Sequence, residues 1–406
     1  MTWRTPTDAD TPTPSSAPSI AVLPFANLSD DPRQEFFADG MVEEIATALT
    51  TFRSLFVVAG GSGLALKGQG LTPQEAGRLL GVRYLLDGAV RRAFDRVNIS
   101  VRLIDARDGA QLWEDQFESA GPDIFSLQDD VALSAAAQIE PGVQTEVRRA
   151  PARPAVDPVA YDLFLRARAL AHDISREAIE QMLPLYERCL ELDPCNARAL
   201  ACSALSLAYM VAFGCPDEAR LRALARERVQ AALRLAPDDA EVLTYAAFAL
   251  NDLQEDLSAA RALADQAIAV NPGHAHGWRA SGWFRVGTEP VEPDIAVEHL
   301  EHCLRLDPLS PRLAWTLTGL GVARLVQRRI EDAIALFRQS AQLSPGYSTN
   351  YLWLATCHAQ LKQFAEASDA AARFRAATGM TVQEFADRVG ASDWMKSRLA
   401  RISLDD

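Results

Sequence analysis

Few side chains in this sequence have the types and spacing that chemistry requires. His299, His302 and Cys303 are three and four residues apart, so one helical face would present all three, as a metal site needs. No convincing acidic or cysteine partner accompanies them, and Cys303 falls where a helical repeat needs a small packing residue. We therefore expect packing here, with no metal and no cofactor.

A glycine-rich stretch is the second chemical candidate. Gly60–Gly63 and Lys67 suggest a phosphate loop, but Gly68 stands where that loop needs serine or threonine, so we predict a turn. Glu43 and Glu44 are adjacent and cannot share a helical face for acid–base work, so we expect them on a solvated face. Without a serine or cysteine that can be joined to a histidine, we predict no catalytic residue and no enzyme.

Composition narrows the class of protein. The chain has 406 residues and a net charge of −14, which repels a phosphate backbone, so we expect no nucleic-acid partner. No apolar run reaches the ~18–20 residues that a membrane span needs. The six cysteines form no C-x-x-C pair, and the N-terminus lacks the apolar core of a signal peptide. We expect reduced thiols and a cytoplasmic location.

Alanines at regular spacing reveal the elements that would position any site. They recur every 34–37 residues in helix-like stretches, and a proline after an apolar segment closes each of four copies and one earlier, more degenerate copy. This period predicts stacked helical pairs near 157–194, 195–237, 239–272, 274–308, 310–345 and 347–379. The alanines are Ala225, Ala260, Ala296, Ala333 and Ala367; the prolines are Pro194, Pro237, Pro272, Pro308 and Pro345.

The N-terminal part has a different pattern. Ser19–Phe25 and Leu55–Ala59 read as buried strands around a helix at Asp30–Phe52, and a short helix ends at Gly81. Three strands and a closing helix follow, over 83–92, 96–105, 110–118 and 123–139. We predict an α+β domain of order βαβαβββα followed by an all-α solenoid. The expected segments are a tail at 1–18, the α+β domain at 19–141, a linker at 142–156, repeats at 157–379 and capping helices at 380–406.

The repeats resemble the tetratricopeptide family. The clearest copy carries Leu320 and Gly321 on its first helix, Ala333 and Phe337 on its second, and Pro345 at its end. Small residues suit the closest helix crossing, and Phe337 would fill the gap between neighbouring pairs. The Trp and Tyr typical of the first helix are mostly replaced.

The α+β segment resembles the TolB-amino-terminal-like domain, also called FlgO-like. The matching stretches are Ser19–Asp31, Phe36–Leu49, Gly81–Arg92, Val101–Phe117 and Asp123–Ala132, whereas Gly60–Gly68 departs from the relatives' more polar turn. Such domains commonly follow a class III adenylate/guanylate cyclase domain or the winged-helix domain of CadC-like regulators. Eighteen preceding residues are too few for either effector.

The concave side of the repeat array is the expected functional surface, because aromatic and arginine side chains there are typical interface anchors. The resemblance implies a non-catalytic scaffold that binds a protein or peptide; self-association stays open. The alternative is the accessory region of a cyclase or transcriptional regulator whose effector is missing or separate. The candidate residues are Tyr245, Asp252, Trp278, Arg285, Trp315 and Gln360, with packing between repeats as the competing interpretation, especially for the two tryptophans.

Overall fold

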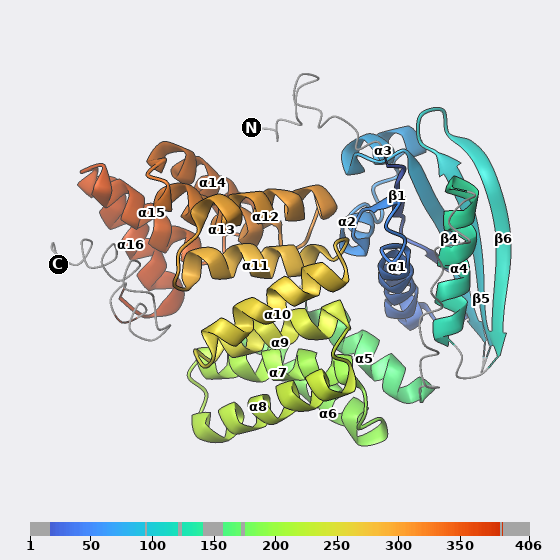
Figure 1. Ribbon diagram of the computed structural model, residues 1–406, viewed down its shortest axis with the longest axis horizontal. Coiled ribbons are helices and arrows are strands. Elements are labelled where there is room, and N and C mark those ends of the chain that lie inside the picture. The colour runs from blue at the N-terminus through green and yellow to red at the C-terminus, as the bar shows by residue number, and fades with distance from the viewer. Residues whose placement is uncertain are drawn as a thin grey trace. The chain divides into compact units, whose positions relative to one another are not determined.

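The structure is a computed structural model that describes residues 17–93, 96–120, 124–140, 157–171, 175–381 and residue 384. It divides into two compact units, Met1–Ala155 and Val156–Asp406 (Figure 1). Nearly all of the expected tail at 1–18 and cap at 380–406, and all of the linker at 142–156, lie outside the described residues.

The first unit is an α/β region built on one mixed sheet. Its strand order is β3-β1-β4-β5-β6, with β2 paired to the far end of β4. β1 runs parallel to β3 and β4, whereas β4, β5 and β6 form antiparallel neighbours. The strands are β1 (Ser19–Val22), β2 (Ala26–Asn27), β3 (Phe56–Val57), β4 (Tyr84–Ala93), β5 (Arg96–Asp105) and β6 (Ala110–Ala120).

Helices of this unit pack on the sheet because their apolar residues recur at helical spacing. Helices α1 and α4 contact each other, and both contact the sheet (Figure 1). Val97, Ile99, Val101 and Leu103 alternate along β5 and are all buried, as the sequence predicts. The helices are η1 (Pro32–Gln34), α1 (Glu35–Leu49), α2 (Gly60–Leu64), α3 (Pro73–Leu80) and α4 (Ile124–Ile139).

Two local expectations in this unit were wrong. Gly60–Gly63 is not a turn but most of the short helix α2, and glycine is required there because a Cβ on Gly63 would lie 1.9 Å from the carbonyl oxygen of Val22. Lys67 forms ion pairs with Glu35 and Asp39 of α1, at 2.7 and 2.6 Å, instead of facing a loop of amides. Glu44, expected on a solvated face, is buried.

The second unit is a tetratricopeptide-like all-α solenoid. In the described part of the chain, its helices form six consecutive pairs, and each of the first five second helices ends two residues before one of the predicted prolines. The first helices are α5 (Pro158–Leu170), α7 (Ala197–Ala212), α9 (Ala240–Asp252), α11 (Ala275–Gly287), α13 (Leu313–Val326) and α15 (Thr349–Gln360). The second helices are α6 (Arg176–Leu192), α8 (Glu218–Leu235), α10 (Leu257–Val270), α12 (Pro293–Leu306), α14 (Ile330–Leu343) and α16 (Phe364–Thr378).

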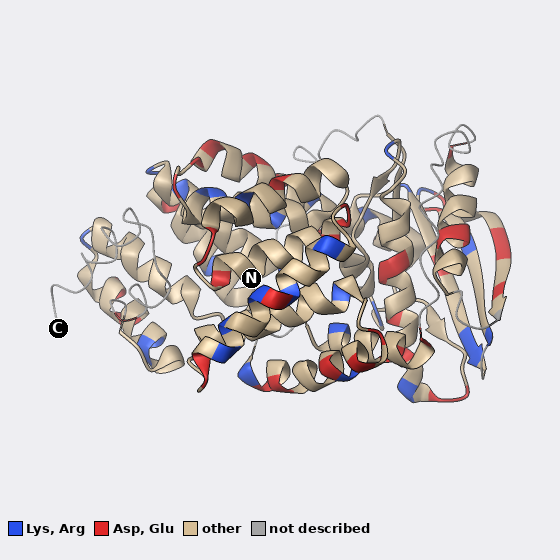
Figure 2. Cartoon of the chain, turned by 60° about the horizontal axis from the view of Figure 1, so that its bottom comes forward, with Lys and Arg blue, Asp and Glu red and all other residues tan. Residues whose placement is uncertain are grey.

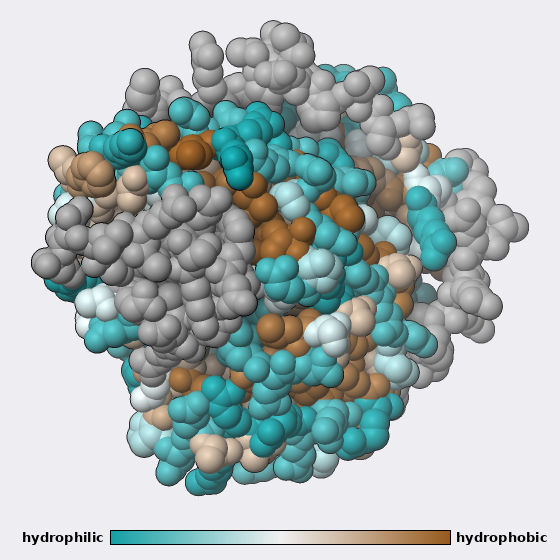
Figure 3. Space-filling view, turned by 60° about the vertical axis from the view of Figure 1, so that its left-hand side comes forward, coloured by the Kyte–Doolittle hydropathy of each residue, from teal (hydrophilic) through white to brown (hydrophobic). Residues whose placement is uncertain are grey.

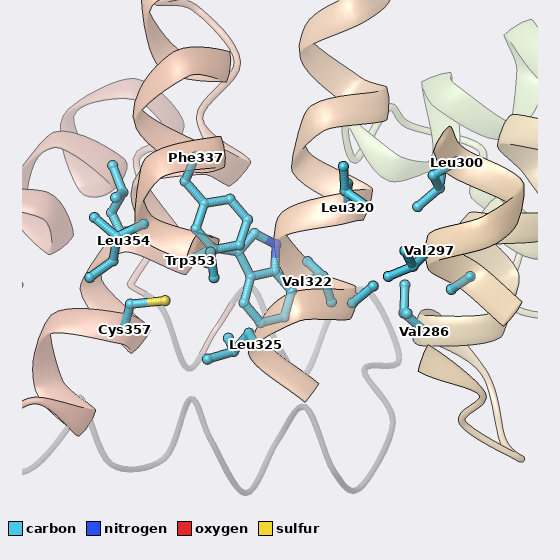
Figure 4. Packing of buried hydrophobic residues seen from close by; sticks show 14 of the residues in the cluster. Val286, Val297, Leu300, Leu320, Val322, Leu325, Phe337, Trp353, Leu354 and Cys357 are labelled. Atoms are coloured by element: carbon cyan, nitrogen blue, oxygen red, sulfur yellow. The ribbon is translucent and has the colours of Figure 1, made fainter. Parts of the chain in front are cut away.

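Small residues let these helices approach closely. All five alanines of the predicted period are buried. At the fifth pair, a Cβ on Gly321 would lie 2.5 Å from Cε1 of Phe337, so glycine is what lets the phenyl ring rest on the α13 backbone. The same ring stacks on Trp353 of the next pair at 6.3 Å between centroids (Figure 4). Phe337 therefore joins neighbouring pairs as predicted.

Candidate functional site

The inner curve of the solenoid is made by its first helices. From α7 onward, successive first helices contact one another, whereas contacts between successive second helices are weaker. The curve is tight enough for Arg312, just before α13, to donate a 2.6 Å hydrogen bond from Nη2 to the carbonyl oxygen of Ala171, just after α5. Side chains of the first helices therefore gather around a common centre.

Four side chains of the inner curve come from four consecutive first helices. Tyr209, Tyr245, Arg279 and Trp315 follow one another at intervals of 34 to 36 residues, on α7, α9, α11 and α13. Of these, Tyr245 and Arg279 are buried, whereas Tyr209 and Trp315 are partly exposed. With Asp252, Arg312 and Tyr347 they form what we call the inner-curve cluster.

Contacts and charges link the members of this cluster. Trp315 lies 5.7 Å from the ring of Tyr347 and 5.5 Å from the guanidinium carbon of Arg312. Burial raises the pKa of Tyr245 to about 12, against the opposing effect of Arg312. Burial also raises the pKa of Asp252 to about 6, against a 3.1 Å hydrogen bond that Asn251 Nδ2 donates to it. After burial, the charge of Asp252 helps to raise the pKa of Tyr347. The structure thus brings Tyr245, Asp252 and Trp315 to the same side of the array.

Trp278 and Arg285 lie elsewhere, against the prediction that they line the concave side. The Trp278 ring packs on His299 and His302 of α12, at 4.9 and 4.3 Å between centroids, and its Nε1 donates to the carbonyl of Pro272. These contacts place it on the side of the second helices.

Arg285 is buried at 8 % exposure between three helices. Its guanidinium makes a bidentate pair with Asp265 of α10, at 2.9 and 3.0 Å, and a longer pair with Glu292 before α12. The side chains of Trp278 and Arg285 therefore make contacts between helices of the array. Gln360, the last residue of α15, is partly exposed.

The histidines that could ligate a metal have other contacts. His299 Nδ1 lies 3.1 Å from Ser281 Oγ, and His302 Nδ1 lies 2.9 Å from Arg305 Nη2. Cys303 is buried beside Thr316, and burial raises the pKa of its thiol to about 12. Within the described ranges, no group of three His, Cys, Asp or Glu side chains is arranged to hold a metal.

Two functional candidates were missed from the sequence, Arg279 and Arg312. Both are buried on the inner curve and belong to the cluster. Arg279 had a usable signal, because it lies seven residues after Pro272, just as Trp315 lies seven residues after Pro308. Trp278, the candidate chosen instead, is one residue out of that register, and on a helix one residue turns the side chain by about 100°.

Charged residues of both signs and a band of hydrophobic residues are visible on the molecule (Figures 2 and 3). In the view of Figure 2, Lys and Arg are interspersed with Asp and Glu over the described helices and strands. On the face shown in Figure 3, hydrophobic residues gather in a central band between hydrophilic ones. Among the described residues, we found no helix with the length and apolarity needed to cross a bilayer.

Comparison with known proteins supports the repeat assignment directly in one segment. Residues 325–379, from the end of α13 through α16, match the family model "Tetratricopeptide repeat". A curated relative, "Putative adenylate cyclase 3" from Rhizobium meliloti (strain 1021), is 40% identical over 185 residues. The match covers 45% of this chain and 32% of the relative, so the chain spans about a third of that protein's length.

The solved structures whose backbones align with this chain have low sequence identity to it. A human IFIT1 dimer with m7Gppp-AAAA has a TM-score of 0.47 at 17% identity and covers 64% of this chain and 59% of its own. PilW, a type IV pilus biogenesis factor, has a TM-score of 0.40 at 17% identity, and the match covers 54% of this chain and 94% of PilW. A thermophilic TPR protein from Thermus thermophilus has a TM-score of 0.38 at 17% identity, and the match covers 54% of this chain and 100% of that protein.

Proposed function

We propose that this protein is a non-catalytic scaffold that binds a protein or peptide partner along the inner curve of its helical array. The observation that carries the proposal is the inner-curve cluster, to which three first helices, α7, α9 and α13, contribute the aromatic side chains Tyr209, Tyr245 and Trp315. Aromatic side chains at a concave surface are typical anchors of protein interfaces. The surface band in Figure 3 also supports a binding role, because contiguous apolar surface commonly marks an interaction site.

The first unit would act as a regulatory or partner-contact module. The order of its predicted strands and helices, together with the stretches that resemble the TolB-amino-terminal-like or FlgO-like domain, supports this proposal. We place the protein in the cytoplasm, because its six cysteines form no disulfide and five of them are buried. The acidic net charge argues against nucleic acid as the partner.

A pair of tryptophans on neighbouring repeats provides a matched test. Trp315→Ala removes a partly exposed ring from the inner curve, whereas Trp278→Ala removes a partly exposed ring that packs on α12. Partner capture by the full chain should fall with Trp315→Ala and persist with Trp278→Ala, with helicity checked by circular dichroism. Equal capture by both variants, or its loss only with Trp278→Ala, would count against the inner curve as the binding surface.

A second candidate function is the accessory or sensory region of a nucleotide cyclase. The favouring observation is the 40% identity to a putative adenylate cyclase over 185 residues. We expect this chain alone to form no cyclic AMP from ATP, and to change the rate of a cyclase that it contacts. Measuring cyclic AMP formation by the Rhizobium meliloti relative, with and without this chain, tests the idea; an unaltered rate argues against it.

A further inference from the structure

Two buried arginines of the inner curve lack the counterions that their neighbours have. Nearby, Arg168 of α5 and Arg198 of α7 both pair with Glu241 of α9, each at 3.3 Å. Arg279 is 2 % exposed and Arg312 is 7 % exposed. No ion pair joins either of these two to a carboxylate in the part of the chain that the structure describes.

The contacts of these two guanidinium groups do not neutralise their charge. Nη1 of Arg279 is buried without a hydrogen-bond partner, and its guanidinium carbon lies 5.6 Å from the Phe248 ring. Arg312 donates to a neutral carbonyl oxygen, that of Ala171, and lies over the ring of Trp315. Aromatic faces attract cations but leave their charge in place.

The two arginines also act on each other. After burial, the charge of Arg312 is the largest influence that lowers the pKa of Arg279, and it outweighs the opposing effect of Asp307. His276 lies near both, and burial together with these two arginines lowers its pKa well below 6.5, so the ring stays neutral at pH 7. Withdrawing a pair of like charges from water is costly unless an anion pairs with them. The buried carboxylate of Asp307 lies 4.0 Å from His276 Nε2, and within the described residues no ion pair joins it to Arg279 or Arg312.

We propose that Arg279 and Arg312 form a binding site for a small oxyanion, either inorganic phosphate or the carboxylate of a small molecule. Guanidinium groups suit both, because their planar N–H donors match two oxygens at once. The ligand must be small, because both side chains are at least nine-tenths buried. This inference is independent of partner binding and adds a ligand-responsive centre to the array, at the point where α5, α11 and α13 converge.

The test uses the purified full chain in a chloride buffer without other oxyanions. Sodium phosphate, sodium acetate and sodium chloride are titrated at matched ionic strength, while melting is followed by circular dichroism and binding by calorimetry. The variants are Arg279→Gln and Arg312→Gln. Arg338→Gln on α14 is the control, because Arg338 is exposed.

Phosphate or acetate should raise the melting temperature of the wild type saturably, by about 3 to 6 °C at ten times the dissociation constant. Sodium chloride should leave the melting temperature unchanged. Response to phosphate alone or to acetate alone distinguishes the two sources of the oxyanion. Arg279→Gln and Arg312→Gln should bind at least about tenfold more weakly, and Arg338→Gln should bind as the wild type does.

Two results would overturn the proposal. One is the absence of a saturable response to either oxyanion in the wild type. The other is an equal response in Arg279→Gln and Arg312→Gln, which would place any site elsewhere. Should Arg279→Gln fail to fold by circular dichroism, Arg312→Gln decides the outcome. Since no partner protein is present, failure here leaves the partner-capture experiment unaffected, and the reverse also holds.

Discussion

Replacing Phe337 with alanine should strongly destabilise the C-terminal end of the solenoid. The side chain is 0 % exposed, and its ring rests on Gly321 on one side and on Trp353 on the other. Because glycine has no side chain that could move into the space, we expect the cavity to stay open. A buried Phe→Ala change costs about 3–5 kcal/mol, and the poor prospects for collapse favour about 4 kcal/mol.

Phe364→Ala on α16 is the matched control, since Phe364 is 61 % exposed and the same change there should cost only about 0.5 kcal/mol. For a unit of this size, about 4 kcal/mol lowers the melting temperature by roughly 8–16 °C. Hydrogen exchange should place the loss of protection in α13–α16, because helical repeats contact mainly their neighbours. A Phe337→Ala protein as stable as Phe364→Ala would refute the packing described here.

Three further predictions concern single contacts. Gly321→Ala should destabilise the protein, because the added Cβ would overpack against Phe337. Combining it with Phe337→Leu should give a double variant at least about 1 kcal/mol more stable than the sum of the two single effects. Additive free energies of unfolding in urea would contradict this coupling. Burial raises the pKa of Asp252 from 3.8 to about 6, so its contribution to stability falls as pH rises from about 4 to 6. Asp252→Asn should therefore stabilise the protein by about 1–3 kcal/mol at pH 7.5 and have no effect at pH 4. Equal effects at the two pH values would argue against a raised pKa for this half-buried carboxyl. The Arg107 guanidinium lowers the pKa of Asp105 to about 2, so Asp105 stabilises the first unit above about pH 4 and loses that effect as pH falls toward 2. Asp105→Asn should lower the free energy of unfolding by about 1–2 kcal/mol at pH 7, because solvent screens the exposed arginines. An acid-unfolding curve that Asp105→Asn leaves unaltered would contradict this.

The repeats were predictable because their signals are local. The alanines at five helix crossings and the prolines after five second helices each lie within one helical pair, so their period placed the pairs. The strands of the first unit were predictable for the same reason, since β5 alternates buried and more exposed residues from Arg96 to Leu103. Gly60–Leu64 was missed because that helix depends on close approach to Val22, a contact that no local pattern announces.

The candidate site was predictable only in part. The helical spacing led to Tyr245 and Trp315, which the structure places on the inner curve, but it led to Trp278 where the neighbouring residue, Arg279, faces that curve. The importance of Arg312 could not be inferred, because its hydrogen bond to Ala171 joins residues 141 positions apart and depends on the curvature of the whole array. Likewise, the pairing of Arg285 with Asp265 depends on the packing of α10 against α11.

The most direct test of partner binding is site-specific photo-crosslinking from the inner curve. A benzoylphenylalanine is introduced as Tyr209→p-benzoylphenylalanine on α7, where the native ring is partly exposed, or as Phe364→p-benzoylphenylalanine on α16, where it is exposed on a second helix. We predict that the α7 probe forms covalent adducts with a distinct polypeptide identifiable by mass spectrometry, and that the α16 probe does not. Adducts from the α16 probe with none from α7 would contradict an inner-curve binding surface.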